Sequence, residues 1–173
     1  SDKALWVNLF IGNTTEVTID GKKVVMKQET DYPWDGLVKL TVTSEQPLGK
    51  ELRIRIPGWC KSYTLSVNGN KVDSTTDKGY TVIKEWKTGD LIVLNMDMPV
   101  EKVSADPRVR QNTGNRALQR VPLVYCLEET DNAKDFADLA LTPTSSFEVK
   151  DEPDNLGGIR SIKAISNGQT LHF

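Results

Sequence analysis

The sequence predicts an all-β protein, an antiparallel β-sandwich of jelly-roll type with at most one short helix. Two observations support this fold class. Apolar and polar residues alternate in several short stretches, and Asp-Gly or Asn-Gly dipeptides stand between such stretches. Alternation with a period of two residues gives a strand one apolar face. Such one-sided strands are typical of antiparallel sheets, whose second face is exposed to water.

Four stretches show the alternation most clearly, at residues 36–44, 51–58, 62–69 and 91–98. Each offers one apolar face to a core and a mostly polar face to solvent. The apolar positions are Val38, Leu40 and Val42; Leu52, Ile54 and Ile56; Tyr63, Leu65 and Val67; and Ile92, Leu94, Met96 and Met98.

Turn signals separate these stretches. Asp20-Gly21 stands between TEVTI and KKVVM, and Asn68-Gly69 between YTLSV and NKVDS. Both dipeptides tolerate the positive φ angles of a type I′ turn, so each predicts a β-hairpin. Thr88-Gly89-Asp90 precedes LIVL and is a further predicted turn.

The domain organisation is predicted as a β-sandwich over residues 1–130, followed by a short helical turn and returning strands over residues 131–173. These last strands would pack on the same sandwich or on an adjoining one. The helix is expected within TDNAKDFADLALTP, residues 130–143, where Pro143 ends it. DEPDNLGG, residues 151–158, reads as a loop before the final strand pair.

The acidic residues of the expected helix suggest a calcium loop, because Asp131, Asp135 and Asp138 lie close together in sequence. A calcium loop of the EF-hand type, however, needs a central Gly and a Glu at its twelfth position, where this chain has Thr142. A solvated, acid-capped turn is therefore the preferred interpretation.

Composition excludes two classes of partner. Among 173 residues, 22 Lys and Arg stand against 24 Asp and Glu, so no basic excess is available for nucleic acid. No apolar run approaches the roughly 20 residues that a membrane span requires. The start at Ser1 shows no signal peptide, so the chain is expected to be a mature product or an excised piece.

Catalytic and metal-binding side chains are scarce. His172 is the single histidine and lies next to the C-terminal residue, which argues against a Ser-His-Asp or Cys-His device. Cys60 and Cys126 have apolar neighbours and are predicted to be buried thiols, with a disulfide between them left open. Zinc sites need about four ligands, mostly Cys and His. We therefore predict no catalytic residue and no metal site.

The stretch DYPWDG, residues 31–36, allows two interpretations. Tyr32, Trp34 and Asp35 could form a carbohydrate-binding clasp, because a turn can hold two rings on one exposed side. Alternatively, Pro33 and Gly36 make a stiff corner between strands, which explains every residue without a ligand. The corner is preferred. The other three tryptophans are expected in the core or at its rim. They are Trp6, Trp59 and Trp86.

Six stretches, taken in order, resemble the C-terminal β-sandwich region of glycoside hydrolase family 127, which includes β-L-arabinofuranosidases. The resemblance covers nearly the whole chain. The stretches are LWVNLFIGN (5–13), QETDYPWDG (28–36), LRIRIPGWC with VNG (52–60, 67–69), GYTVIKEWKTGD (79–90), MPVEKVSADPRV (98–109) and ALQRVPLVYCLEETDN (117–132).

The resemblance implies an upstream (α/α)6 barrel with a catalytic cysteine in a zinc site, and none of those motifs maps onto this sequence. The chain is therefore expected to be a non-catalytic accessory fragment, cut at both ends, that braces the barrel of a bacterial enzyme acting on plant-derived, arabinose-containing glycans. It would need no cofactor itself, whereas the barrel would bind zinc. The expected partner is that barrel, and a homodimer of the parent and a bound glycan remain open.

Two alternatives to the bracing role stay open from the sequence. One is a carbohydrate-binding module that uses Tyr32 and Trp34, and the other is a free-standing interaction domain of the cell envelope. For the parent protein, the kind of polymer attacked favours a periplasmic or secreted location over the cytoplasm.

Overall fold

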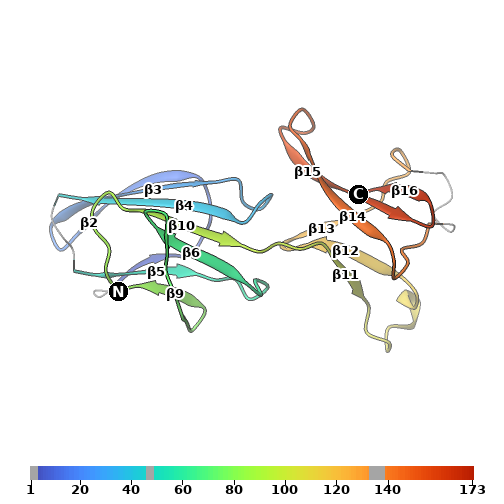
Figure 1. Cartoon of the computed structure of the whole chain (residues 1–173), viewed down its shortest axis with the longest axis horizontal. Helices are drawn as coiled ribbons and strands as arrows, with labels where there is room; N and C mark the ends of the chain where they lie inside the picture. Colours follow the sequence, from blue (N-terminus) through green and yellow to red (C-terminus); the bar gives the residue numbers. More distant parts are fainter. Residues whose placement is uncertain (1–3, 46–48, 133–138) are drawn as a thin grey trace. The chain divides into compact units, whose positions relative to one another are not determined.

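The computed structural model describes residues 4–45, 49–132 and 139–173. The chain forms two compact units, Ser1–Met98 and Pro99–Phe173, each built from β-strands (Figure 1). Within the described residues the one helical element is a 3-10 turn, η1 (Arg110–Asn112). No helix in this part of the chain has the length and apolar character needed to cross a membrane. The prediction of an all-β, sandwich-like fold is confirmed.

The first unit contains a four-stranded and a six-stranded sheet (Figure 1). The four-stranded sheet has the order β1 (Ala4–Val7), β5 (Glu51–Arg55), β9 (Tyr80–Ile83) and β8 (Thr76–Asp77). The six-stranded sheet has the order β2 (Asn13–Ile19), β3 (Lys22–Thr30), β4 (Leu37–Ser44), β10 (Leu91–Met96), β6 (Tyr63–Val67) and β7 (Asn70–Lys71). Pairing is antiparallel as predicted, except that β1 runs parallel to β5.

The core of this unit joins the two sheets. Its buried side chains come from the six-stranded sheet, as with Leu40 and Leu94, and from the four-stranded sheet, as with Leu52 and Ile54, all four with 0% exposure. The alternation therefore predicted the buried face correctly. Tyr63 is only half-buried, because β6 lies beside the two-residue edge strand β7.

The predicted hairpins are confirmed. Asp20 and Gly21 have φ values of 50° and 73° and connect β2 to β3. Asn68 and Gly69 have φ values of 51° and 81° and connect β6 to β7. Positive φ at both central positions is the signature of a type I′ turn. The third predicted turn is also present, closed by the Lys87 N–H, which donates to Asp90 Oδ2 at 2.7 Å.

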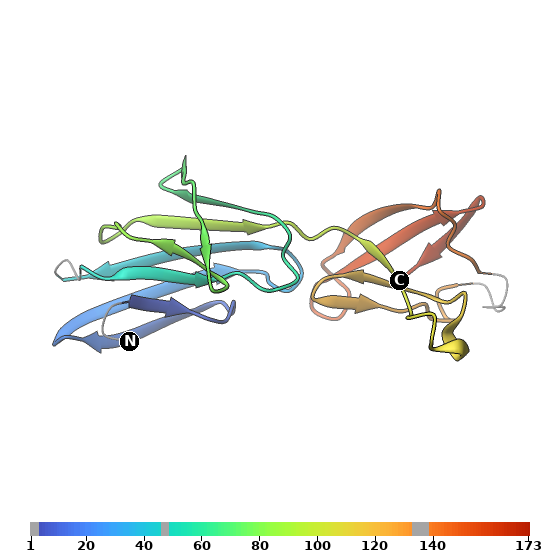
Figure 2. The ribbon, with the colours of Figure 1, turned by 90° about the horizontal axis from the view of Figure 1, so that it is seen from below.

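The second unit contains two three-stranded antiparallel sheets, seen as separate yellow and orange-red layers in Figure 2. One sheet has the order β11 (Glu101–Ser104), β12 (Arg116–Arg120) and β13 (Leu123–Tyr125). The other has the order β14 (Ser146–Glu152), β15 (Ile159–Ser166) and β16 (Gln169–His172). The predicted final strand pair is thus formed by β15 and β16.

The units divide between Met98 and Pro99, not between residues 130 and 131 as predicted. The reason is strand pairing. β11, β12 and β13 pair with one another, and among the described residues no strand pairs across the division. Residues 133–138 of the predicted helix at 130–143 lie outside the described residues, and Asp135 and Asp138 are among them.

The two cysteines are free thiols in different environments. Cys60 is half-buried and packs against the core of the first unit, which is close to the prediction. Cys126 is exposed, so the prediction of a buried thiol was wrong there. It follows Tyr125, the last residue of β13, where the chain leaves the sheet.

Candidate functional site

The predicted carbohydrate-binding residues lie in a hydrogen-bonded corner between β3 and β4. The Tyr32–Pro33 peptide bond in this corner is cis. Three bonds hold it: Trp34 N–H donates to Asp31 O (2.8 Å), Leu37 N–H to Asp35 Oδ1 (2.9 Å) and Tyr32 N–H to Thr30 Oγ1 (3.1 Å). The side chain of Asp35 therefore fixes the entry into β4.

Gly36 lets this corner approach β10 closely. A Cβ atom at Gly36 would lie 2.0 Å from Met96 O, which is far inside van der Waals contact. The Met96 N–H donates to Gly36 O at 3.0 Å. Glycine is needed here for the close approach of two backbones, and not for an unusual φ angle.

The Tyr32 ring packs against aromatic rings of the protein itself. It meets the Phe10 ring edge-on, with centroids 5.5 Å apart, and lies nearly parallel to the Trp59 ring at 6.4 Å. Burial of the ring raises the pKa of Tyr32 above its ordinary value. These contacts agree with the corner interpretation. The carbohydrate-binding role of Tyr32, Trp34 and Asp35 stays a prediction.

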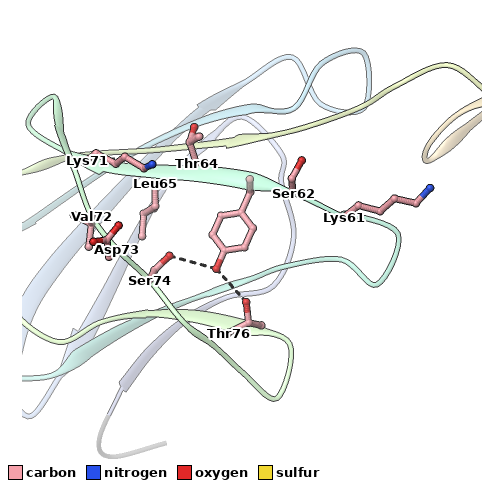
Figure 3. A pocket seen from close by; sticks show the side chains of 10 residues that line it. Lys61, Ser62, Thr64, Leu65, Lys71, Val72, Asp73, Ser74 and Thr76 are labelled. Carbon is pink, nitrogen blue, oxygen red and sulfur yellow. Dashed lines mark hydrogen bonds between the residues drawn. The ribbon is translucent and has the colours of Figure 1, made fainter.

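A second concave site lies on the first unit and was not found from the sequence. It is a pocket of about 340 Å³ (Figure 3). Among its lining residues, Tyr63 has its hydroxyl 3.0 Å from Thr76 Oγ1 and accepts a hydrogen bond from Ser74 Oγ at 3.3 Å. The lining residues are Lys61, Ser62, Tyr63, Thr64, Leu65, Lys71, Val72, Asp73, Ser74 and Thr76.

Metal-ligating side chains do not gather anywhere in the part of the chain that the structure describes. There, no group of three or more His, Cys, Asp or Glu residues is placed to hold an ion. His172 lies on β16, and its backbone N–H donates to Asn132 Oδ1 at 2.9 Å. The two candidate sites, the corner and the Tyr63 pocket, therefore offer a ligand aromatic rings and hydroxyl groups instead of metal-binding side chains.

Two family models match the chain consecutively. The model of the β-L-arabinofuranosidase GH127 middle domain matches residues 4–98, and that of the glycoside hydrolase family 127 C-terminal domain matches residues 100–165. The chain belongs to glycoside hydrolase family 127. The change from one family domain to the next coincides with the division between the two compact units.

Individual relatives agree with this assignment. The chain is 35% identical, over 169 residues, to the non-reducing end β-L-arabinofuranosidase of Bifidobacterium longum subsp. longum, covering 92% of this chain. A crystal structure of a family 127 β-L-arabinofuranosidase from Geobacillus stearothermophilus T6 matches all of the chain with a TM-score of 0.87 and 39% identity. A further family 127 β-arabinofuranosidase structure matches 98% of it, with a TM-score of 0.86 and 31% identity.

These relatives are much longer than the chain. It spans 25% of the Bifidobacterium relative, and 30% and 31% of the two solved chains. The matched region of each relative is therefore a minor part of its polypeptide.

Proposed function

We propose that this chain is the non-catalytic β-sandwich part of a bacterial family 127 glycoside hydrolase, and that its work is to brace the catalytic barrel of the parent. The observation that carries the proposal is the match to the middle and C-terminal domain models, combined with a span of only 25% of the curated relative. The parent is proposed to act as a β-L-arabinofuranosidase on plant-derived, arabinose-containing glycans.

The chemistry of the described residues supports a non-catalytic role. Most glycoside hydrolases use two carboxylates that face each other across a cleft, whereas the family resemblance implies a catalytic cysteine in a zinc site. The carboxylate of Asp35 is engaged with the backbone of the corner, since its Oδ1 accepts a hydrogen bond from the Leu37 N–H. We therefore propose that the catalytic residues and the zinc ion, which the family resemblance implies, belong to the barrel of the parent protein. We also propose a periplasmic or secreted location for the parent, where such polymers are met.

The chain itself provides the first test. Incubated with an aryl β-L-arabinofuranoside, it should release no aryl alcohol above the buffer rate, with or without added zinc. Turnover that scales with the concentration of the pure chain would refute the non-catalytic role. The Bifidobacterium relative, assayed in parallel, controls for the quality of the substrate.

Bracing is tested on the full-length parent. Substituting Gly36 by Ala, which forces the corner away from Met96, should lower the thermal stability of the whole enzyme and not only of this region. A parent whose barrel unfolds at an unchanged temperature would argue against bracing.

A carbohydrate-binding module is the alternative function, because the corner holds Tyr32 and Trp34 half-exposed on a rigid backbone. Titration with arabinan oligosaccharides, followed by Trp fluorescence, distinguishes the two. A saturable response that disappears in Trp34→Ala favours binding at the corner, and a flat response favours bracing alone.

A further inference from the structure

The pocket around Tyr63 lies beside the edge strands of the two sheets of the first unit. β7 is an edge strand of the six-stranded sheet and β8 of the four-stranded sheet, and residues 72–75 connect them. In Figure 3 Ser74 and Thr76 approach the pocket from this connection and from β8, opposite Leu65 on β6. The pocket is therefore framed by regular strands on two sides.

The hydroxyl groups of this pocket form a short chain with unused bonding capacity. Ser74 Oγ donates a hydrogen bond to the Tyr63 oxygen at 3.3 Å. A second hydrogen bond joins the Tyr63 and Thr76 hydroxyls at 3.0 Å, and either of them can be its donor. Three hydroxyls carry three protons, and the two hydrogen bonds use two of them. Whichever way the second bond runs, one proton and several lone pairs are left for a molecule in the pocket.

A fourth hydroxyl lies behind this chain. Thr81 pairs with Thr76 in the sheet and has 0% exposure, and within the described residues its Oγ1 forms no hydrogen bond of normal geometry. Burial opposes ionisation of the Tyr63 phenol, but the nearby hydroxyls of Ser74, Thr76 and Thr81 outweigh it, so the pKa of Tyr63 lies below its ordinary value.

The rest of the lining suits a small, uncharged ligand. Val72 and the ring of Tyr63 are half-buried and line the pocket, so an apolar surface lies beside its hydroxyls, whereas Leu65 is buried. The charged residues carry both signs, with Lys71 and Asp73 close in sequence, and the Lys61 side chain points away from Ser74 in Figure 3. A volume of about 340 Å³ is at the low end of the roughly 300–1,000 Å³ of small-molecule sites.

We propose that this pocket binds a neutral, polyhydroxylated ring of monosaccharide size, such as a terminal sugar of a glycan. Hydroxyls that both donate and accept match a polyol, whose own hydroxyls do the same, and the apolar patch suits the CH face of the ring. The site is distinct from the corner of Tyr32 and Trp34, and its existence does not depend on the bracing role.

The experiment is a titration of the isotope-labelled 173-residue chain with methyl β-L-arabinofuranoside, followed by backbone amide NMR shifts. We expect saturable, weak binding, with the largest shifts at Ser74 and Thr76. Tyr63→Phe, which keeps the ring, and Ser74→Ala should each weaken binding by roughly three- to tenfold, the effect of one neutral hydrogen bond.

Matched variants make the result decisive. Tyr80→Phe removes another phenol hydroxyl of this unit, which bonds Asn8 Oδ1 at 2.9 Å, and should leave binding unchanged. Trp34→Ala should also leave it unchanged, because that residue belongs to the corner. Absence of saturable shifts, loss of binding in Trp34→Ala, or equal binding of cyclopentanol would each overturn the proposal.

Discussion

The two units of this chain reach a folded state by different means. In the first unit, both sheets contribute large apolar side chains to one continuous core. The described residues of the second unit supply few fully buried apolar side chains, although its six strands also form two sheets. Those buried side chains are Leu118, Ile162, Ala164 and Leu171.

Polar anchors take a larger share of the second unit. The Asn132 side chain donates to Glu128 O and to His172 O, each at 2.9 Å, and accepts from the His172 N–H at 2.9 Å. The buried Ser166 hydroxyl donates to Ala140 O and accepts from Ser145 Oγ at 2.9 Å. A unit with little apolar area to bury needs such bonds to hold its loops. The first unit should thus be sensitive to lost volume, and the second to lost hydrogen bonds.

The largest effect is expected at Gly36. Its substitution by Ala puts a Cβ atom 2.0 Å from Met96 O, and neither backbone can move without breaking the bond from the Met96 N–H to Gly36 O. We expect a loss of about 3 kcal/mol or more in the free energy of unfolding of the first unit. Urea titration followed by Trp fluorescence measures it. Gly58→Ala is the control, because a Cβ there has nothing within 4 Å.

Leucine truncation compares the two cores directly. Leu40→Ala in the first unit and Leu118→Ala in the second remove side chains with 0% and 1% exposure. Each should cost about 2–5 kcal/mol. Because no described strand pairs across the division, hydrogen exchange should report the loss only in the unit that carries the substitution. Equal loss of protection in both units would show that they unfold as one.

Removal of the Asn132 anchor should have a smaller effect, confined to the second unit. Asn132→Ala leaves Glu128 O and both backbone groups of His172 without this side chain. The expected loss is about 1–3 kcal/mol, with faster amide exchange along β16. Thr170→Ala, at an exposed position of the same strand, is the control and should change little. Unchanged exchange at His172 would contradict the anchoring role.

Local rules explain what the sequence could predict of this fold. Strand faces follow from alternation within a few residues, as with Val38, Leu40 and Val42, and the hairpins follow from single dipeptides such as Asn68-Gly69. Sheet membership is different, since it depends on distant partners. The parallel pairing of β1 with β5 and the grouping of strands on either side of Met98 depend on such distant partners, so they were not predicted.

The candidate sites divide in the same way. Because of Pro33 and Gly36, the corner could be predicted from the six residues 31–36 alone. Its packing could not, because Phe10 and Trp59, which pack on Tyr32, are far away in sequence. The Tyr63 pocket was missed because alternation assigns Tyr63 to the core face. Its polar environment comes from Ser74 and Thr76, which fold back onto it after the Asn68-Gly69 hairpin. The one sequence signal for the pocket was the pair of hydroxyl residues, Ser74 and Thr76, that follows the Asn68-Gly69 hairpin.

Acid titration gives the smallest expected effect and occurs in both units. The Lys87 backbone N–H and the Asn68 side chain donate to Asp90, and they hold the pKa of its carboxyl below the ordinary 3.8. In the second unit, bonds from Ser161 and Asn155 lower the pKa of Glu152 below 4.5. A lowered folded-state pKa adds stability above the unfolded pKa, and this stability is lost as the pH falls through the folded value.

Neutral variants separate these two contributions. Asp90→Asn should destabilise the first unit slightly at pH 7. The difference in stability between this variant and the unsubstituted chain should shrink below pH 4, since the Asp90 carboxyl of the unsubstituted chain is then losing its charge. Glu152→Gln should do the same in the second unit alone. Both effects are expected to be smaller than that of Asn132→Ala, because these carboxylates face water, which screens their interactions. Thermal unfolding from pH 7 to pH 3, followed unit by unit with NMR, measures them, and a difference that grows on acidification would reverse the assigned sign.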